Sequence, residues 1–376
     1  MTRTDTTGAG TGAKQSGQPA ASVRIESVTK KYGGTVAVDG VSLDIAAGEF
    51  VSLLGPSGSG KTTLLMAIAG FERPDGGRIL VGGRDVTGLP PHRRGFGVVF
   101  QRYALFPHMS VRDNVGYALR MRGRPLGERN RAVDEVLELV DLGGFADRRP
   151  DQLSGGQAQR VALARALVYR PPVILFDEPL GALDRKLREQ VQLEIRRLHR
   201  ELGLTMIFVT HDQEEALVLS DRVAVLSDGR IEQFDRGAEL YHRPRTEFVA
   251  GFLGRTNSFD ATVAGRDGDT VTVAVGGRTV TGHAPDPGPL AEGGACVVTI
   301  RPEALRLVPA GTDGGLTGTV AELVFSGPTT TARIDVDGRP LLVQGLSGDP
   351  GFDVREGDRV AVAVPPGAAR VFPGRR

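Results

Sequence analysis

The sequence predicts an α/β domain followed by a smaller all-β domain. From about Ser22 to Arg245, short β-branched runs such as FVSLL, GVVF and VILF alternate with amphipathic helical stretches. After about Thr246 the strand patterns are short, Gly, Asp and Pro separate them, and helical periodicity is scarce. Because unbroken apolar strands alternate with helices in the first part, we expect a parallel sheet covered on both faces there.

Length and composition narrow the class of protein. The chain has 376 residues, with 46 Lys and Arg against 45 Asp and Glu, so no overall field favours nucleic acid, and we expect no nucleic-acid partner. The single cysteine, Cys296, excludes an intramolecular disulfide and a cysteine-rich metal site, which fits a reducing cytosol. No apolar run approaches membrane-spanning length and no signal-peptide pattern begins the chain, so we expect neither feature.

The composition divides the chain into three parts. Residues 1–21 are mostly Thr, Gly, Ala, Ser and Gln with little to bury, so we predict a disordered tail. Residues 22–245 form the α/β domain, where Val133, Val136, Leu137 and Val140 share one helical face. A second such face consists of Leu187, Val191, Ile195, Leu198 and Leu202. Residues 246–376 contain TVTVAV, ACVVTI, TTTARIDV and RVAVAV, which favour a small barrel or sandwich.

A phosphate-binding loop follows the first apolar strand, residues 50–54. The segment GPSGSGKTT has the required strand before it, and we expect a helix over residues 62–71 after it. Its glycines let main-chain N–H groups approach phosphate oxygens, Lys61 supplies positive charge, and the Thr62 hydroxyl suits Mg²⁺. The expected phosphate-binding residues are Gly55, Pro56, Ser57, Gly58, Ser59, Gly60, Lys61, Thr62 and Thr63.

Two carboxylates end a later apolar strand, in VILFDEP. Asp177 is well placed to hold magnesium, usually through water, and Glu178 could polarise an attacking water. Taken alone, such a pair is equally typical of a solvated strand end. Behind a phosphate loop, the functional interpretation is favoured.

A second candidate anion site lies in LSGGQAQR, ahead of the helical pattern VALARALV. Ser154, Gly155 and Gly156 would present a hydroxyl and backbone amides at a helix N-terminus. One nucleotide-binding chain thus carries two phosphate-binding segments, which a single nucleotide does not require.

Five segments resemble, in order and spacing, the ATP-binding subunits of ATP-binding-cassette transporters: GPSGSGKTT, LSGGQ, VILFDEP, GALD and VTHDQEEA. The resemblance covers the region 22–245 and implies a P-loop NTPase fold with a helical subdomain, ATP and Mg²⁺ as cofactors, and ATP hydrolysis. It also implies that two copies pair head to tail, so that Ser154, Gly155, Gly156 and Gln157 close over the γ phosphate held by the partner. The second phosphate-binding segment would then serve the partner's ATP.

The same resemblance assigns four more residues. Tyr32 is similar to the residue that stacks on adenine, Gln101 to the glutamine that senses magnesium and the attacking water, and His211 to the histidine that contacts the γ phosphate. Asp184, in GALD, corresponds to the loop that crosses the dimer interface. The alternatives are a core or turn tyrosine, an ordinary polar loop residue and a histidine at a strand end.

Two positions depart from the family pattern. Many relatives have serine where this chain has Gly181, and glutamine is frequent where it has Ala158. Neither change is expected to abolish activity, since the neighbouring Asp184 and the LSGGQ segment are intact.

Residues 103–107, YALFP, are unusually apolar for a loop. They favour a docking site for a helix of a membrane partner, with core packing as the alternative. This stretch resembles that of bacterial importer ATPases, and FVAGFLGRTNSFDATV with TIRPEALRL resembles the entry into their OB-like (TOBE) barrel, which can regulate the dimer. The implied partners are two membrane-spanning permease subunits, an extracytoplasmic substrate-binding protein and a second copy, with the chain at the cytoplasmic face of the membrane.

The substrate is less determined, because the partner subunits select it. The overall resemblance is strongest to spermidine/putrescine importers, while importers of ferric iron, 2-aminoethylphosphonate, sulfate, thiamine or sugars remain open. A soluble cassette ATPase of translation or DNA repair is a distant alternative, since such proteins typically carry two cassettes, long coiled coils or zinc modules. A third hypothesis makes the β domain primarily a small-molecule regulator.

Overall fold

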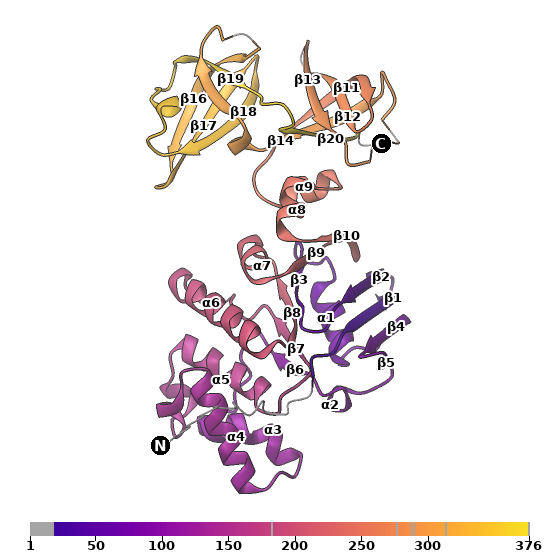
Figure 1. The fold of residues 1–376 in the computed structure, drawn as a ribbon, viewed down its shortest axis with the longest axis vertical. Coiled ribbons are helices and arrows are strands. Elements are labelled where there is room, and N and C mark those ends of the chain that lie inside the picture. Colours follow the sequence, from indigo (N-terminus) through magenta and orange to yellow (C-terminus); the bar gives the residue numbers. More distant parts are fainter. Residues whose placement is uncertain are drawn as a thin grey trace, which may run out of the picture. The chain divides into compact units, whose positions relative to one another are not determined.

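The computed structural model describes residues 19–374 apart from residues 182, 276, 287, 289 and 313. The disordered tail predicted for residues 1–21 therefore falls almost entirely outside the described residues. The chain divides into two compact units, Met1–Leu53 with Gly58–His211, and Leu54–Ser57 with Asp212–Arg376 (Figure 1).

The first unit contains the predicted parallel sheet. Its strands β3 (Phe50–Leu54), β8 (Thr205–Thr210), β7 (Val173–Asp177) and β6 (Gly97–Val99) are neighbours in that order. β6, β7 and β8 run parallel, and every residue of β3 and β8 is buried. The unbroken apolar pattern of these strands reflects that burial, so the prediction of a parallel sheet is confirmed.

A second, antiparallel sheet in the first unit was not predicted. It has the order β2-β1-β4-β5, formed by β1 (Val23–Tyr32), β2 (Thr35–Ile45), β4 (Gly76–Val81) and β5 (Arg84–Asp85). Val23, Ile25 and Val28 of β1 are buried while Arg24 and Ser27 are not fully covered. These strands are buried on one face only, and register shifts interrupt the alternation of apolar and polar residues along them. Their sequence pattern is therefore weak.

The helix after the phosphate loop is α1 (Lys61–Ala69), which ends two residues before the predicted Phe71. Gly70 ends it with a left-handed backbone (φ 86°), and its N–H donates to the Met66 carbonyl at 2.9 Å. A Cβ at Gly70 would lie 2.5 Å from Nε of Arg94, so glycine is required on steric grounds as well. α1 packs against β7 and β8.

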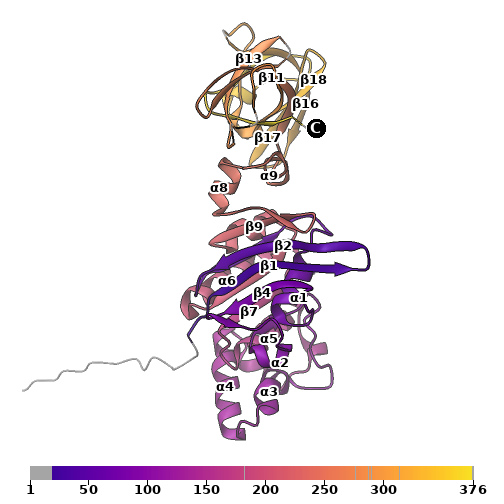
Figure 2. The ribbon, with the colours of Figure 1, turned by 90° about the vertical axis from the view of Figure 1, so that its right-hand side faces the viewer.

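Three helices form a separate layer in the first unit: α3 (Val111–Met121), α4 (Leu126–Leu139) and α5 (Gly155–Leu167), which pack on one another (Figure 2). The helical face predicted around Val133, Val136 and Leu137 is buried. In α6 (Arg185–Leu202), Val191, Ile195 and Leu198 of the second predicted face are buried. Leu187 is half-buried and Leu202, the final residue, is 37% exposed.

The second unit begins with three short helices and a hairpin. These are α7 (Gln213–Leu219), β9 (Arg222–Ser227), β10 (Arg230–Asp235), α8 (Gly237–His242) and α9 (Glu247–Phe252). Leu240, Val249 and Leu253 are fully buried in one cluster with β9 residues. α9 lies where only strands were expected, because Thr246 caps it by accepting a hydrogen bond from the Val249 N–H at 3.2 Å.

The remaining strands build the predicted β domain. β11 (Asn257–Asp267), β12 (Thr270–Val275), β13 (Arg278–His283), β20 (Ala369–Pro373) and β14 (Ala295–Ile300) close into a barrel, which confirms the small barrel. A five-stranded sheet accompanies it, in the order β15 (Arg306–Pro309), β19 (Arg359–Ala363), β16 (Leu316–Phe325), β17 (Thr329–Val336) and β18 (Arg339–Leu346). The two share one apolar cluster, which includes Val298, Val343 and Val371.

Within the part of the chain that the structure describes, no helix is both long enough and apolar enough to cross a membrane.

Candidate functional site

The phosphate loop joins the buried strand β3 to helix α1. Gly58 and Gly60 both have left-handed backbones, with φ of 82° and 91°, which L side chains rarely adopt. Gly60 is the N-cap residue of α1 and makes no side-chain cap hydrogen bond, so no capping side chain stands between the loop and the start of the helix. The loop therefore presents backbone N–H donors that suit an anion.

Lys61, the first residue of α1, is 5% exposed. Its Nζ donates to Oγ of Ser59 at 3.5 Å. Burial lowers the pKa of Lys61, and the nearby Glu178 carboxylate counteracts part of that shift. A partly desolvated ammonium interacts strongly with an incoming phosphate, because the local dielectric is low.

Thr62 and Asp177 meet from different elements. The Thr62 Oγ1 in α1 donates to Oδ1 of Asp177, the last residue of β7, at 3.3 Å. Burial raises the pKa of Asp177, the Thr62 hydrogen bond lowers it, and the neighbouring Glu178 charge raises it. The hydroxyl and the carboxylate form a pair of hard oxygen donors of the kind that Mg²⁺ prefers beside phosphates, so the residues fit that ion.

Two other predicted site residues converge on Glu178. Its Oε2 lies 3.4 Å from Nε2 of Gln101 and 3.3 Å from Nδ1 of His211. These residues follow the carboxyl ends of β6, β7 and β8, which are neighbouring parallel strands, and ligands bind at that edge of such sheets. The fold thus assembles side chains from three distant parts of the sequence.

The backbone of Glu178 is strained. Its φ of 44° is left-handed, an uncommon conformation for a residue that is neither Gly nor Asn, and its N–H donates to the Val209 carbonyl at 3.1 Å. The side chain is 23% exposed, so water can reach it. A carboxylate held in this way, with two polar neighbours that fix its orientation, can polarise a water molecule.

The LSGGQ segment forms the N-terminus of α5. Ser154 and Gln157 make a capping box: Ser154 Oγ accepts from the Gln157 N–H at 3.3 Å, and Gln157 Oε1 accepts from the Ser154 N–H at 2.9 Å. Gly155 is exposed, whereas Gly156 is buried and a Cβ there would lie 2.8 Å from Cδ1 of Leu187. Gly156 therefore has a packing role that the sequence did not reveal.

The structure does not link this segment to Glu178. Among the described residues, the hydrogen bonds of Ser154 stay within its own helix. Asp184 caps α6 by accepting from the Leu187 N–H at 3.0 Å and is exposed. Tyr32 ends β1 with 47% of its surface exposed, and Lys30 Nζ lies 5.2 Å from its ring centroid. These exposed groups are available to a partner or ligand.

The loop after Gln101 is held by two residues that sequence reasoning missed. Arg165 of α5 donates to the carbonyls of Tyr103 and Ala104 at 2.7 and 2.6 Å, and both loop residues have left-handed backbones. Asn114, fully buried in α3, pairs with the N–H and carbonyl of Phe106. Asn114 is a polar residue among the apolar positions of this helix, and that pattern could have indicated its structural role from the sequence.

The apolar run 103–107 is only partly on the surface. Ala104 and Pro107 are exposed, while the other three residues are half-buried. The Phe106 ring lies 4.7 Å from that of Tyr117 in α3, and burial raises the pKa of Tyr103. The run therefore combines packing against the helical layer with exposure of part of its apolar surface. At Gly181, where many relatives have serine, an added Cβ would lie 3.7 Å from Nε2 of Gln101, which is an ordinary contact distance.

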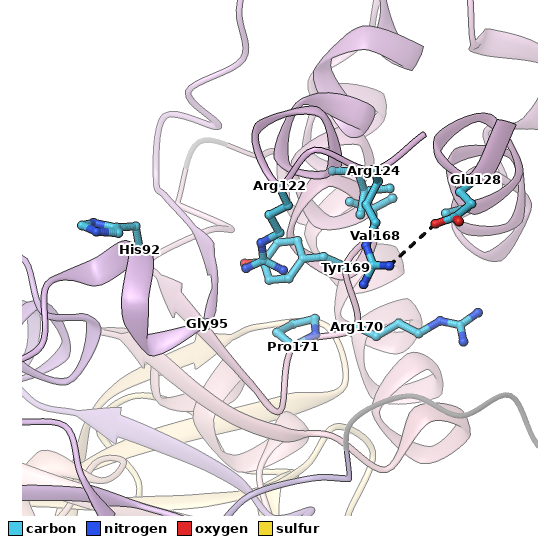
Figure 3. A pocket seen from close by; sticks show the side chains of 11 residues that line it. His92, Gly95, Arg122, Arg124, Glu128, Val168, Tyr169, Arg170 and Pro171 are labelled. Carbon is cyan, nitrogen blue, oxygen red and sulfur yellow. Dashed lines mark ion pairs between the residues drawn. The ribbon is translucent and has the colours of Figure 1, made fainter. Parts of the chain in front are cut away.

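A cavity of about 650 Å³ opens between the ends of α2 (Pro91–Arg94), α3 and α5 and the start of α4 (Figure 3). Arg122 stacks over the Tyr169 ring at 3.9 Å, and Arg124 pairs with Glu128 at 3.7 Å. The Tyr169 hydroxyl donates to the Phe96 carbonyl, and burial raises its pKa to about 12. With Arg170 and His92 also in the lining, the cavity is rich in basic side chains.

Two family models and several curated proteins match this chain. Residues 38–181 match the ABC transporter family, and residues 298–372 match the TOBE domain family. The chain is 48% identical over 371 residues to the spermidine/putrescine import ATP-binding protein PotA of Rubrobacter xylanophilus, covering 98% of this chain and 95% of that protein. It is 47% identical over 373 residues to the protein of the same name from Thermobifida fusca, covering 96% of each.

Solved structures agree over the cassette. The dimeric structure of MJ0796, a bacterial ABC transporter cassette, is 38% identical with a TM-score of 0.52, over 57% of this chain and 98% of that chain. The structure of cbiO1 from Clostridium perfringens, part of the ABC transporter complex cbiONQ, is 31% identical with a TM-score of 0.55, over 58% and 89%. The chain belongs to the ABC transporter family, among the import ATP-binding proteins with a C-terminal TOBE domain.

Proposed function

We propose that the chain is the ATP-hydrolysing subunit of an importer that takes up spermidine and putrescine. The observation that carries the catalytic part is the convergence of Gln101 and His211 on one oxygen of Glu178, next to the Thr62–Asp177 pair. The substrate is inferred from the name that the two relatives share, since each aligns over nearly its whole length.

The phosphate loop would hold the β and γ phosphates. Backbone amides from Gly58 to Thr62 donate to phosphate oxygens, and the buried Lys61 ammonium balances their charge. Thr62 and Asp177 would hold Mg²⁺, with Gln101 close by. When bound, the ion neutralises charge on the β and γ phosphates. The Tyr32 ring, exposed at the end of β1, would stack on adenine.

Glu178 would orient and polarise the attacking water. The hydrogen bond from Gln101 and the contact with His211 fix its carboxylate at the edge of the sheet. The exposed His211 is free to turn toward a γ phosphate and report its presence. Removing the phosphate would remove that contact, so hydrolysis would change the local structure.

A second copy would complete the site. Ser154 and Gly155 are exposed at the positive end of the α5 dipole, where they would contact the partner's γ phosphate. Asp184 would lie in the loop that faces the partner. Closure would then depend on the triphosphate, because the diphosphate lacks the group that this helix end binds.

The membrane partners would dock on the helical layer. The partly exposed run 103–107 and the basic cavity of Figure 3 both lie on α3 and α5, which therefore present an apolar and a basic surface to a permease helix. The chain would then lie at the cytoplasmic face of the membrane, under two permease subunits that work with an extracytoplasmic substrate-binding protein.

Uptake tests the proposed substrate. Cells that carry either this chain or its Glu178→Gln form as the sole copy are given labelled putrescine, spermidine, ferric iron, 2-aminoethylphosphonate, thiamine and maltose. We expect the Glu178→Gln cells to lose polyamine uptake alone. Loss of another single substrate would retain the mechanism and replace the cargo. No loss at all, with the chain absent from the membrane fraction, would contradict the importer role.

A further inference from the structure

Gln213 makes a two-sided contact with the segment that leads into the β domain. Its Oε1 accepts a hydrogen bond from the Gly254 N–H at 2.8 Å, and its Nε2 donates to the Phe252 carbonyl. Phe252 is the last residue of α9, so its carbonyl lacks an acceptor role within the helix. One side chain thus binds both sides of the turn between α9 and β11.

Gln213 is also the first residue of α7, two positions after His211. Asp212, the N-cap between them, accepts hydrogen bonds from the N–H groups of Glu214 and Glu215 at 2.8 and 3.2 Å. This cap fixes the start of α7 directly after the histidine, so a backbone change at His211 must displace the start of α7 or strain the cap.

The contact continues into the β domain through packed groups. Gly254 is left-handed (φ 79°), and a Cβ there would lie 3.1 Å from Cε2 of Tyr241, so the turn is tightly enclosed. Arg301 donates to the Arg255 carbonyl at 3.1 Å and lies 4.3 Å from the Tyr241 ring centroid. Tyr241 in turn donates to Glu303, which follows β14.

We infer that Gln213 is a positioning residue that transmits the nucleotide-dependent state of the His211 segment to the β domain, through Phe252, Gly254 and Arg301. The inference rests on the proposed function, since it takes His211 to respond to the γ phosphate. Its physical content is a set of hydrogen bonds and ring contacts from α7 to the segment after β14, joined at Gly254 and Arg255 by the chain itself. It assigns the β domain a response to ATP that needs no ligand of its own.

The chain offers a matched control in Gln233. This β10 residue also makes a two-sided amide contact, accepting from the Arg245 N–H at 2.8 Å and donating to the Arg243 carbonyl at 3.3 Å. It is 3% exposed, so its replacement should disturb packing at least as much as that of the half-buried Gln213. Gln233 is not close to His211 in the sequence, whereas Gln213 is two residues away. A difference between the Gln213 and Gln233 variants therefore tests the link to His211.

The experiment is hydrogen exchange of residues 252–257 in the full-length Glu178→Gln chain, with and without ATP and Mg²⁺. We expect ATP to change exchange there by at least about fivefold, a typical allosteric coupling. Gln213→Leu should abolish the change while ATP affinity is retained, and Gln233→Leu should keep it. Gln213→Glu, which retains the acceptor for Gly254, should keep part of the change and serves if the leucine variant does not fold.

The outcomes separate the two proposals. ATP binding without any exchange change at residues 252–257, or equal loss of the change in the Gln213 and Gln233 variants, would overturn the inference alone. Failure of the Glu178→Gln chain to bind ATP would contradict the proposed function, and with it the inference.

Discussion

At the scale of single residues, the site depends on Glu178. Its strained backbone and the two polar groups within 3.4 Å of Oε2 hold one carboxylate at the edge of the sheet. Lys61 is buried and Asp177 is half-buried, each at a cost in solvation. These costs are typical of groups arranged for chemistry rather than for stability. Replacing them should therefore separate binding, hydrolysis and stability.

Glu178→Gln should lower the ATPase rate by about 10²- to 10⁴-fold, because the amide cannot act as a general base. ATP affinity should persist, since the phosphate loop is unchanged. Lys61→Ala should instead weaken ATP binding through lost charge compensation. Equilibrium binding and single-turnover kinetics on both variants check this, and equal loss of affinity in both would contradict the separate roles.

Asp177→Asn should raise the unfolding temperature of the nucleotide-free chain at neutral pH while abolishing hydrolysis. Burial raises the pKa of Asp177, so the folded state holds the proton more tightly than the unfolded state. The folded state therefore loses stability as the pH rises from the ordinary pKa of aspartate through the raised pKa of Asp177. Asparagine cannot ionise, so it removes that loss, and its side-chain oxygen still accepts the hydrogen bond from Thr62. The gain should shrink toward about pH 4, where the unfolded-state aspartate is largely protonated. Thermal unfolding at both pH values measures it, and an equal gain at both would refute the assignment to Asp177 ionisation.

At the scale of elements, close approaches decide which substitutions the helices tolerate. α5 begins against α6, so its two N-terminal glycines differ: Gly155 is exposed, and Gly156 lies under Leu187. The loop after β6 depends in turn on Arg165 of α5, which holds two left-handed residues. One helix therefore serves the second phosphate-binding segment and the proposed docking loop.

Gly156→Ala should destabilise the chain by about 1–3 kcal/mol, because the added methyl overpacks against Leu187. Gly155→Ala, whose Cβ would lie 3.6 Å from Leu183, should leave stability nearly unchanged and lower the ATPase rate of the dimer. Urea unfolding compares the two variants. Adding Leu187→Ala to Gly156→Ala should recover part of the loss, and no recovery would show that overpacking is not the cause.

Arg165→Met should reduce transport more than hydrolysis. The methionine keeps the apolar stem and removes both hydrogen bonds to the carbonyls of Tyr103 and Ala104, so the loop loses its fixed conformation. The isolated chain should retain most of its ATPase activity. Uptake and ATPase assays on the assembled transporter measure the difference, and Arg188→Met, on α6, is the control. Unchanged transport would exclude this loop as a docking element.

At the scale of the whole molecule, the first compact unit buries apolar residues such as Phe176 and Phe208, and the second unit contains two apolar clusters. The cluster around Val298 and Val343 belongs to the β domain, and the cluster around Leu240 and Val249 belongs to the short helices before it. The phosphate loop and Glu178 are carried mainly by the first unit. ATP binding should therefore stabilise the first unit more than the second.

Calorimetry of the full chain should show two transitions, because the chain divides into two compact units. ATP with Mg²⁺ at about 100 times its dissociation constant should stabilise one of them by about 2.7 kcal/mol. The Glu178→Gln form should show the effect without hydrolysis, and Lys61→Ala should not show it. A single transition shifted by ATP as a whole would show that the units unfold together.

The sequence predicted the parallel sheet, the loop before α1, the carboxylates after β7 and the β barrel. Each rests on a local pattern: a buried strand is a continuous apolar run, and a phosphate loop needs glycines beside a strand and a helix. The sequence did not predict the antiparallel sheet of β1, β2, β4 and β5, whose alternation is broken by register shifts. Features that depend on a local sequence pattern could therefore be predicted from the sequence alone.

Only the tertiary structure decided the long-range contacts. It places Gln101 and His211 on one oxygen of Glu178, buries Gly156 under Leu187, and seats Gln213 on Phe252 and Gly254. The longest of these contacts, between Gln101 and Glu178, joins residues 77 positions apart in the sequence. Periodicity determines which face of an element is buried, but which elements become neighbours depends on packing of the whole chain.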